Sequence, residues 1–242
     1  MKDLIKVTIV AVSMLILSSC SNDDCIQVEG AIVTKSLTLA TFDKLETRIS
    51  GKINISQGDE QSVTVTGNQS IIDNLSTDII NRTVIIDLMG CFNYDNLEIN
   101  IVVPKIYDIV STGSNGININ GFVNQKDLSL LITGSGDITI GDFKNLEIIT
   151  SEITGSGNII FNNTQSSIVK TATIKSTGSG NYKGFSVLAN DYLVSLSGSG
   201  NCEVNAKDNL NITLTGSGNV YYKGMPSLSL NITGSGNIEN VN

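Results

Sequence analysis

The chain has 242 residues, contains neither His nor Trp, and carries 15 basic against 23 acidic residues, for a net charge of −8. Without His, a His-assisted nucleophile and a zinc site that includes His are excluded. The acidic balance argues against nucleic acid as a partner, and the mixture of Ile, Val, Leu and 23 Gly favours many short strands in one or two all-β domains.

The first residues are typical of a secretory signal. Two lysines precede an apolar run from Val7 to Leu17, which is about half as long as the ~20 residues that a membrane-spanning helix needs. The run ends in the letters LSSC at Cys20. This ending resembles a bacterial lipobox, in which the signal is removed before the cysteine and the cysteine carries the lipid. We therefore expect residues 1–19 to be a lipoprotein signal peptide and Cys20 to be the lipid attachment site, with a membrane-anchor helix as the alternative.

A polar and acidic stretch, SNDD, follows Cys20. It resembles the acidic export tag of surface-displayed lipoproteins of Gram-negative bacteria, although a solvated tether has the same composition. We interpret residues 20–30 as an acidic tether and predict an outer membrane lipoprotein that is exposed at the cell surface, with the periplasmic face as the alternative. Removing residues 1–19 leaves 13 basic and 22 acidic residues, a net charge of −9. The lipid on Cys20, rather than surface charge, would therefore hold the protein to a membrane.

Three further cysteines follow the lipobox. An exported protein can join two of them in a disulfide, and Cys25 with Cys91 is the pair that we favour. Cys202 alternates with Val204 after a corner motif, so we expect it to face inward as a small hydrophobic side chain. No spacing resembles a metal site, and no cofactor is predicted.

Residues 31–110 contain several short stretches in which apolar and polar residues alternate, for example Ile53-Asn54-Ile55-Ser56. Such alternation predicts half-buried strands, and the segment from Gly67 could form a turn of helix. We interpret 31–110 as irregular opening coils that shield the end of a longer core. A separate sandwich domain is the alternative.

The letters GSG recur through residues 111–242 at intervals of 18 to 23 residues, after a degenerate copy, TGSNG, that contains Gly113. The intact copies begin at Gly134, Gly155, Gly178, Gly198, Gly216 and Gly234. Between them, stretches such as Leu210 to Thr215 alternate strictly. Each repeat turns at least twice and leaves too few residues for a crossover helix, so the repeats are β-structured.

Two architectures suit these repeats: a β-solenoid, in which each strand stacks parallel on its copy one repeat away, and an antiparallel β-sandwich. The recurring block T/S-G-S-G-N/D favours the solenoid, because stacked neighbours share an environment. We expect its glycines to turn the chain through positive φ angles. We also expect a ladder of stacked amides, which Asp137 begins as the one acidic member. Its asparagines are Asn158, Asn181, Asn201, Asn219 and Asn237.

Four sequence segments occur in this order: FDKL from Phe42, ISGKINISQGDEQSVTVTGNQSIIDNLSTDIINRTVIIDL, LEINIVVPKIYDIVSTGS, and then the repeated GSG. Across roughly residues 40 to 236 this order resembles the putative auto-transporter adhesin, head GIN domain family. The resemblance implies an exported protein or lipoprotein of a Gram-negative bacterium with a right-handed parallel β-helix-like fold. It also implies an adhesive role.

No catalytic constellation emerges from the sequence. The corners lack the Lys-Ser/Thr pair of a phosphate-binding loop. The repeat column is Asn rather than the Asp of calcium-binding repeats. Four carboxylates that could serve a polysaccharide lyase or hydrolase fall at different coil positions, so we interpret them as solvated surface charge. They are Asp142, Glu147, Glu152 and Glu203.

Aromatic and basic residues break the repeat after two corners, in NYKG and NVYYKG. Such residues suit contacts with a glycan or a surface protein. The candidate ligand contacts are Tyr182, Lys183, Tyr221, Tyr222 and Lys223. Because neighbouring Tyr221 and Tyr222 must face opposite sides of a strand, we expect one of them to be in the core.

We therefore predict a non-enzymatic, lipid-anchored envelope protein that acts as an adhesin or surface-binding solenoid. The alternatives are a carbohydrate-active enzyme on a β-helix and a structural envelope component. The last corner lies close to Asn242, and an uncovered coil exposes a sheet edge. We accordingly expect a homodimer through the C-terminal coil, or strain in that coil.

Overall fold

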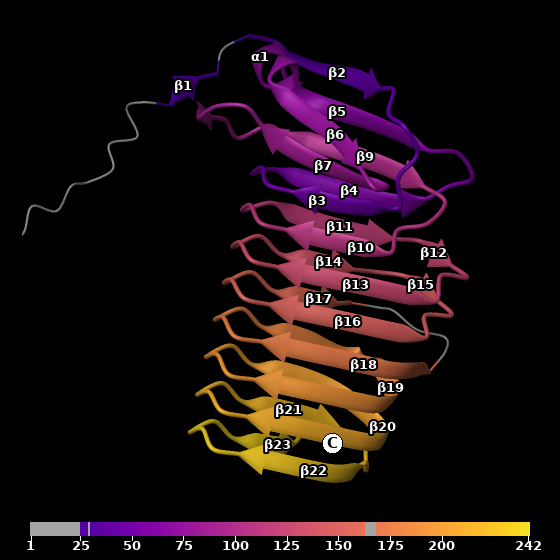
Figure 1. Ribbon diagram of the computed structural model, residues 1–242, viewed down its shortest axis with the longest axis vertical. Helices are drawn as coiled ribbons and strands as arrows, with labels where there is room; N and C mark the ends of the chain where they lie inside the picture. Colours follow the sequence, from indigo (N-terminus) through magenta and orange to yellow (C-terminus); the bar gives the residue numbers. More distant parts are fainter. Residues whose placement is uncertain (1–24, 29, 163–167) are drawn as a thin grey trace, which may run out of the picture.

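The computed structural model describes residues 25–28, 30–162 and 168–242. Strands make up 59% of the chain and helix 2%, and coils of about 21 residues stack into a β-solenoid. This confirms the predicted fold class. The solenoid forms one elongated column in Figure 1, with a broader N-terminal end. The predicted signal peptide, Cys20 and the start of the tether lie outside the described residues.

Two sheets of stacked strands form opposite sides of the column. In the first face each strand pairs parallel with its neighbour. In stacking order it contains β7 (Thr83–Leu88), β3 (Lys44–Thr47), β10 (Asp108–Ser111), β13 (Asp127–Ile132), β16 (Ile148–Ile153), β18 (Val169–Ser176), the second halves of β19 (Tyr182–Leu196) and β20 (Cys202–Leu214), and β22 (Ser227–Ile232).

The second face is parallel in the same way. Strands β19 and β20 are long enough to contribute to both faces. In stacking order the second face contains β9 (Glu98–Val103), β4 (Lys52–Gln57), β11 (Gly116–Asn120), β14 (Ile138–Ile140), β17 (Ile159–Phe161), the first halves of β19 and β20, β21 (Val220–Lys223) and β23 (Ile238–Asn240). A minor parallel pair, β12 (Phe122–Val123) with β15 (Phe143–Lys144), lies outside both faces.

Antiparallel strands cover the N-terminal end of the stack. Strand β6 (Leu75–Ile80) pairs with β7, while β5 (Ser62–Asn68) pairs with β9 and then with β2 (Ile32–Leu37). The five-residue helix α1 (Gln69–Asp73) packs above them and buries Ile71 and Ile72 (Figure 1). No helix in the described part of the chain could cross a membrane, since α1 falls far short of the length required. We call β2, β5, β6 and α1 the cap.

The first layers do not follow chain order. The β3 and β4 coil lies between the β7 and β9 coil on one side and the β10 and β11 coil on the other. After β2, the chain therefore makes one coil, completes the cap, makes a second coil above the first, and returns past the first coil to continue the column. On the way back, the N–H of Tyr107 donates to the carbonyl of Asp43 at 2.8 Å.

The core is filled by columns of side chains in register. One column of the second face begins with Ile99, Ile53 and Ile117 and continues down the whole stack. Its further members are Ile138, Ile159, Tyr182, Cys202, Val220 and Ile238. Down to Val220 each is at most 1% exposed. Burial of such apolar columns, at roughly 25 cal/mol per Å², holds the coils together.

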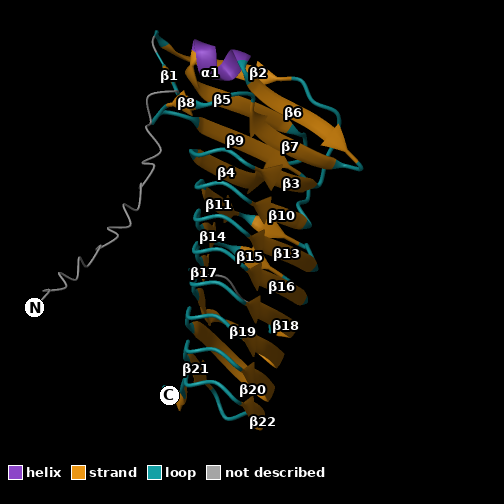
Figure 2. Ribbon diagram, turned by 60° about the vertical axis from the view of Figure 1, so that its left-hand side comes forward, coloured by secondary structure: helices purple, strands orange, loops and turns teal. Residues whose placement is uncertain are grey.

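The GSG corners line up along one edge of the column (Figure 2). At each corner the serine N–H donates to the carbonyl of the first glycine in the preceding coil, for example Ser217 to Gly198 at 3.1 Å. The corners therefore continue the coil-to-coil hydrogen bonding of the strands.

The expected reason for the corner glycines is wrong. None of them has a positive φ angle; the positive-φ glycines lie elsewhere in the described chain, for example Gly121 and Gly224. The actual reason is close approach, because a Cβ on Gly216 would lie 2.1 Å from the carbonyl oxygen of Gly198. A Cβ on Gly218 would lie 1.9 Å from that of Gly200. Real Cβ atoms do not come this close to backbone, so any side chain would push the coils apart.

The predicted asparagine ladder is present. The side-chain oxygen of each member accepts the backbone N–H of the next, at 2.8 Å from Asn201 N to Asn181 Oδ1 and 2.9 Å from Asn219 N to Asn201 Oδ1. Asp137 begins the ladder by accepting from Asn158 N at 2.7 Å. The acceptor oxygen is thus the feature common to all stacked members.

The last coil keeps the register of the coil before it but is open on its far side. In β22, Leu228, Leu230 and Ile232 are 42%, 46% and 47% exposed, although the side chains they follow in β20 are buried. No described coil covers them.

Candidate functional site

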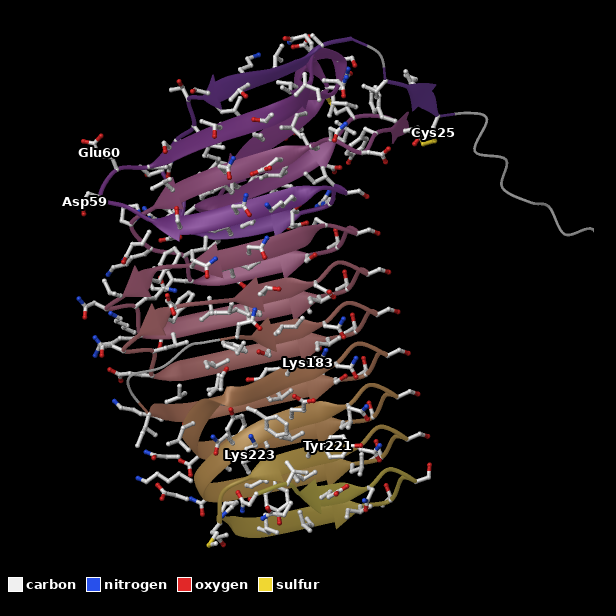
Figure 3. The ribbon with its side chains drawn as sticks, turned by 180° about the vertical axis from the view of Figure 1, so that it is seen from behind. Cys25, Asp59, Glu60, Lys183, Tyr221 and Lys223 are labelled. Carbon is white, nitrogen blue, oxygen red and sulfur yellow. A yellow bond between two sulfur atoms is a disulfide. The ribbon has the colours of Figure 1, made fainter. Side chains whose placement is uncertain are left out.

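The repeat-breaking residues fall on two different sides of the second face. Lys183, Glu203 and Tyr221 are neighbours in register on β19, β20 and β21. Lys183 is exposed and the other two are half-buried, so this column faces outward. Lys223 is in register with Asn205. Figure 3 shows Lys183, Tyr221 and Lys223 on the same face of the column.

Tyr182 cannot be a surface contact, which corrects its assignment as a candidate ligand contact. It is 1% exposed and packs against Phe161 with 5.8 Å between ring centroids. It occupies the inward column because it follows its corner at the same distance as Ile159 and Cys202 do. Cys202 faces inward as expected.

Tyr222 is the inward member of the tyrosine pair. It follows Val204 in register and packs partly buried against the core. Tyr221 faces the other way, and its hydroxyl oxygen accepts a hydrogen bond from Asn219 Nδ2 at 3.4 Å. This confirms that one of the two lies against the core, and leaves Tyr221 as the surface aromatic.

Phe185 joins the outward residues because it lies two positions after Lys183 on β19, on the same side of the strand. The ammonium of Lys223 lies over its ring, 4.7 Å from the centroid, in the geometry of a cation–π contact. We name Lys183, Phe185, Glu203, Tyr221 and Lys223 the β19–β21 patch. It combines two cations, a carboxylate and two aromatic rings on a hydrogen-bonded sheet.

Three titratable groups near this part of the core have strongly shifted pKa values. Burial raises the pKa of Tyr182, of Tyr192 and of Cys202. The Tyr192 hydroxyl donates to the carbonyl of Val187 at 2.9 Å. These groups remain protonated and enclosed, so their shifts reflect packing rather than preparation for acid–base chemistry.

Two of the four candidate carboxylates, Glu147 and Glu152, form ion pairs between coils. Glu147 contacts Lys126 at 2.9 Å and also pairs with Lys170. Hydrogen bonds from Lys170 and then Lys126 lower the pKa of Glu147. Glu152 pairs with Lys175 at 2.6 Å. Within the described residues, no three His, Cys, Asp or Glu side chains are grouped to hold a metal ion.

Cys25 and Cys91 are joined by a disulfide, with 4.7 Å between their Cα atoms. The bond lies at the cap end of the molecule (Figure 3). It fastens the short pair β1 (Ile26–Gln27) and β8 (Phe92–Asn93). The described N-terminus is thereby tied to the cap.

Sequence reasoning missed two hollows. A groove of about 370 Å³ crosses the first face around Leu193, which is 43% exposed between Ser, Thr and Asn side chains. A cleft of about 390 Å³ lies where the cap meets the first coils, near Asp59 and Lys105. The groove is formed by the outer side chains of ordinary repeat strands, which carry no distinguishing motif, and the cleft is assembled from segments far apart in the chain.

A model of the family described as putative auto-transporter adhesin, head GIN domain, matches residues 41–226. The match includes the first coils, the GSG corners up to Gly216 and the β19–β21 patch. No curated protein matches the chain.

Solved structures share the fold. A putative adhesin from Bacteroides fragilis is 22% identical with a TM-score of 0.81, over 89% of this chain and 100% of that one. A putative adhesin from Parabacteroides merdae is 20% identical with a TM-score of 0.68, over 90% and 100%. A putative lipid binding protein from Parabacteroides distasonis is 20% identical with a TM-score of 0.67, over 90% and 99%. At such identities the likeness concerns the fold alone.

Proposed function

The chain belongs to the putative auto-transporter adhesin, head GIN domain family, and we propose that it is a non-enzymatic, lipid-anchored adhesin that binds through the β19–β21 patch. The family indicates a cell-surface protein. The single observation that carries the proposed contact surface is the register that brings Lys183, Tyr221 and Lys223 onto one outward face. Aromatic side chains are enriched in protein binding surfaces, and charged side chains around them, such as the lysines here, contribute to specificity and to the association rate.

The position of the patch supports this proposal. The described chain starts at the cap, where Cys25 is held by its disulfide. A lipid on Cys20 would therefore place the cap next to the membrane and the C-terminal coils away from it. The solenoid has about six turns, which at about 4.8 Å each amount to roughly 29 Å. The patch lies in the distal half of this length (Figure 3).

Adhesion is testable with cells that express the full chain. We expect such cells to adhere to mucin-coated or fibronectin-coated surfaces, and the variant K183A/Y221A/K223A to lose most of that adhesion at equal surface display. The matched control K126A/K170A/Y94A removes the same residue types elsewhere. Equal adhesion by the patch variant would overturn the proposed surface, and no adhesion by wild-type cells to either coating would overturn the adhesin.

The carbohydrate-active alternative has its own readout. Incubation of the full chain with a panel of polysaccharides is expected to release no new reducing ends. Turnover that disappears in Glu203→Gln, the carboxylate variant of the patch, would overturn the non-enzymatic proposal.

Lipid anchoring is tested by labelling. Cells grown with radioactive palmitate should label the wild-type chain and not Cys20→Ser, and the wild-type chain should sediment with outer membranes. External protease on intact cells should degrade it if it is surface-exposed. An unlabelled wild-type chain would contradict the anchor, and full protease protection would favour the periplasmic face.

A further inference from the structure

The cleft near Asp59 forms where the out-of-order layers meet. It is lined by the loop 58–61 between β4 and β5, the link 104–107 that returns to β10, the residues just before β3, and Arg82 at the β6–β7 turn. A second hollow of about 500 Å³ continues it along the same edge and shares Asp59, Pro104 and Lys105. Both volumes are in the range of small-molecule sites, about 300–1,000 Å³. Asp59 lies at the edge opposite the GSG corners (Figure 3).

Two glutamines hold the walls of these hollows. Gln61 accepts from the N–H of Phe42 at 3.0 Å and donates to the carbonyl of Ala40 at 3.0 Å. Gln57 accepts from the N–H of Val123 at 2.9 Å and donates to the carbonyl of Pro104 at 3.0 Å. Each side chain thus clamps another segment through both ends of its amide. The walls are pre-organised, which lowers the entropic cost of binding.

The same clamps exclude one class of ligand. A peptide that binds by strand addition needs a row of unpaired backbone N–H and C=O groups. At this edge the backbone groups of Phe42, Pro104 and Val123 already pair with glutamine side chains. Recognition in the cleft therefore depends on side chains rather than on an open sheet edge.

The charged side chains of the cleft balance one another. Arg82 pairs with Asp43 at 2.8 Å, and this contact raises the pKa of the guanidinium. With Asp59 and Lys105, the cleft contains two carboxylates and two cations in total. Neither Asp59 nor Lys105 has a hydrogen bond or ion pair to another described residue. Asp43 Oδ1 is buried and has no donor among the described residues. The cleft therefore offers hydrogen-bonding capacity that the protein itself does not use.

The chemistry fits a polyhydroxylated ligand without net charge. Carboxylate, ammonium and guanidinium groups can bond hydroxyls as acceptors and donors, while the ring of Tyr107 and the surface of Pro104 offer apolar faces to C–H groups. The equal number of acidic and basic groups favours neutral sugars over uronates. We propose that this cleft and the adjoining hollow bind a neutral oligosaccharide. The inference builds on the proposed surface-binding function and adds a second site to it.

The test measures binding of defined hexasaccharides to the full chain, purified from expressing cells. The neutral probes are cellohexaose, maltohexaose, xylohexaose, mannohexaose and chitohexaose, and hexagalacturonate is the acidic probe. Saturation-transfer NMR detects binding and calorimetry measures Kd. We expect at least one neutral probe to bind, and D59A/K105A to weaken it at least tenfold. The matched control K207A/D208A removes an exposed pair of the same charges and should leave Kd unchanged.

Three results would overturn the inference: no binding of any neutral probe, binding of hexagalacturonate alone, or equal Kd in wild type and D59A/K105A. A Tyr107→Ala variant, which keeps all four charges, is a second test and should also weaken binding of the neutral probe. Circular dichroism of each variant checks that the fold is retained. The adhesion assay on K183A/Y221A/K223A is independent of this site, so the two proposals can fail separately.

Discussion

At the scale of single residues, position after the corner decides which side a side chain faces. Cys202 was expected to face inward from its alternation with Val204, and Tyr182 follows its own corner at the same distance. The same count predicts Tyr182 in the core, where the structure places it. An aromatic ring beside a lysine is typical of a binding surface, but the register of Tyr182 on its strand determines that it faces the core.

The corner glycines show a limit of sequence reasoning. Their recurrence predicts a corner, but whether glycine is needed for a positive φ angle or for close approach depends on the neighbouring coil. At Gly216 it is the carbonyl of Gly198 that leaves no room for a Cβ. A local sequence pattern does not determine the distance between two segments of the chain.

The asparagine ladder leads to a prediction about one oxygen. Asn201→Ala removes the acceptor of the Asn219 N–H, now 2.9 Å away. We expect it to lower the free energy of unfolding by about 1–2 kcal/mol, because a partly buried donor loses its partner. Asn201→Asp keeps the acceptor, as Asp137 does at the start of the ladder, and should cost less.

Chemical denaturation followed by circular dichroism measures these differences. Asn211→Ala, on the exposed outer side of β20, is the control and should remain within about 0.5 kcal/mol of wild type. Equal losses for Asn201→Ala and Asn201→Asp would show that the acceptor oxygen is not the stabilising feature.

At the scale of elements, the repeat region was predictable and the cap was not. Alternation and the fixed corner specify parallel stacking, because identical residues recur at one coil position. Between residues 31 and 110 apolar and polar residues also alternate along the strands, but this alternation does not indicate which strand pairs with which. The antiparallel pairing of β5 with β9, and the placement of β9 beyond β4, depend on contacts between segments that share no repeat. The cleft, assembled by this arrangement, was invisible for the same reason.

The disulfide between Cys25 and Cys91 fastens β1 to the cap, so its removal should destabilise that end. The two cysteines are 66 positions apart, for which the chain-entropy estimate is at most about 4 kcal/mol. We expect Cys91→Ser to lower the unfolding midpoint in thermal denaturation. Cys25→Ser should have the same effect, and the double variant should add little, because one bond is lost in every case. Maleimide labelling of both cysteines in unreduced wild-type protein would contradict the prediction.

At the scale of the whole molecule, the two ends of the described column differ. The cap covers the first coils with antiparallel strands and α1, whereas β22 presents Leu228, Leu230 and Ile232. The register of the last coil is regular, so strain in that coil, one of the two expectations from sequence, is not what distinguishes it. The distinguishing feature is apolar side chains beside a strand edge that no described strand pairs with, which in general promotes association.

We therefore predict that the full chain self-associates through its C-terminal coil. Two identical ends meet most simply about a twofold axis, with each β22 contacting the other. Sedimentation velocity over a concentration series should show dimers for the wild type and a shift to monomer for Leu230→Lys, because a charge in the contact must be desolvated. The control is Leu193→Lys, since Leu193 is 43% exposed against 46% for Leu230 but lies on the outer side of the first face. The dimer would be refuted if the wild-type protein stayed monomeric at every concentration. If dimers persisted in Leu230→Lys but not in Leu193→Lys, the contact would instead lie on the outer side of the first face.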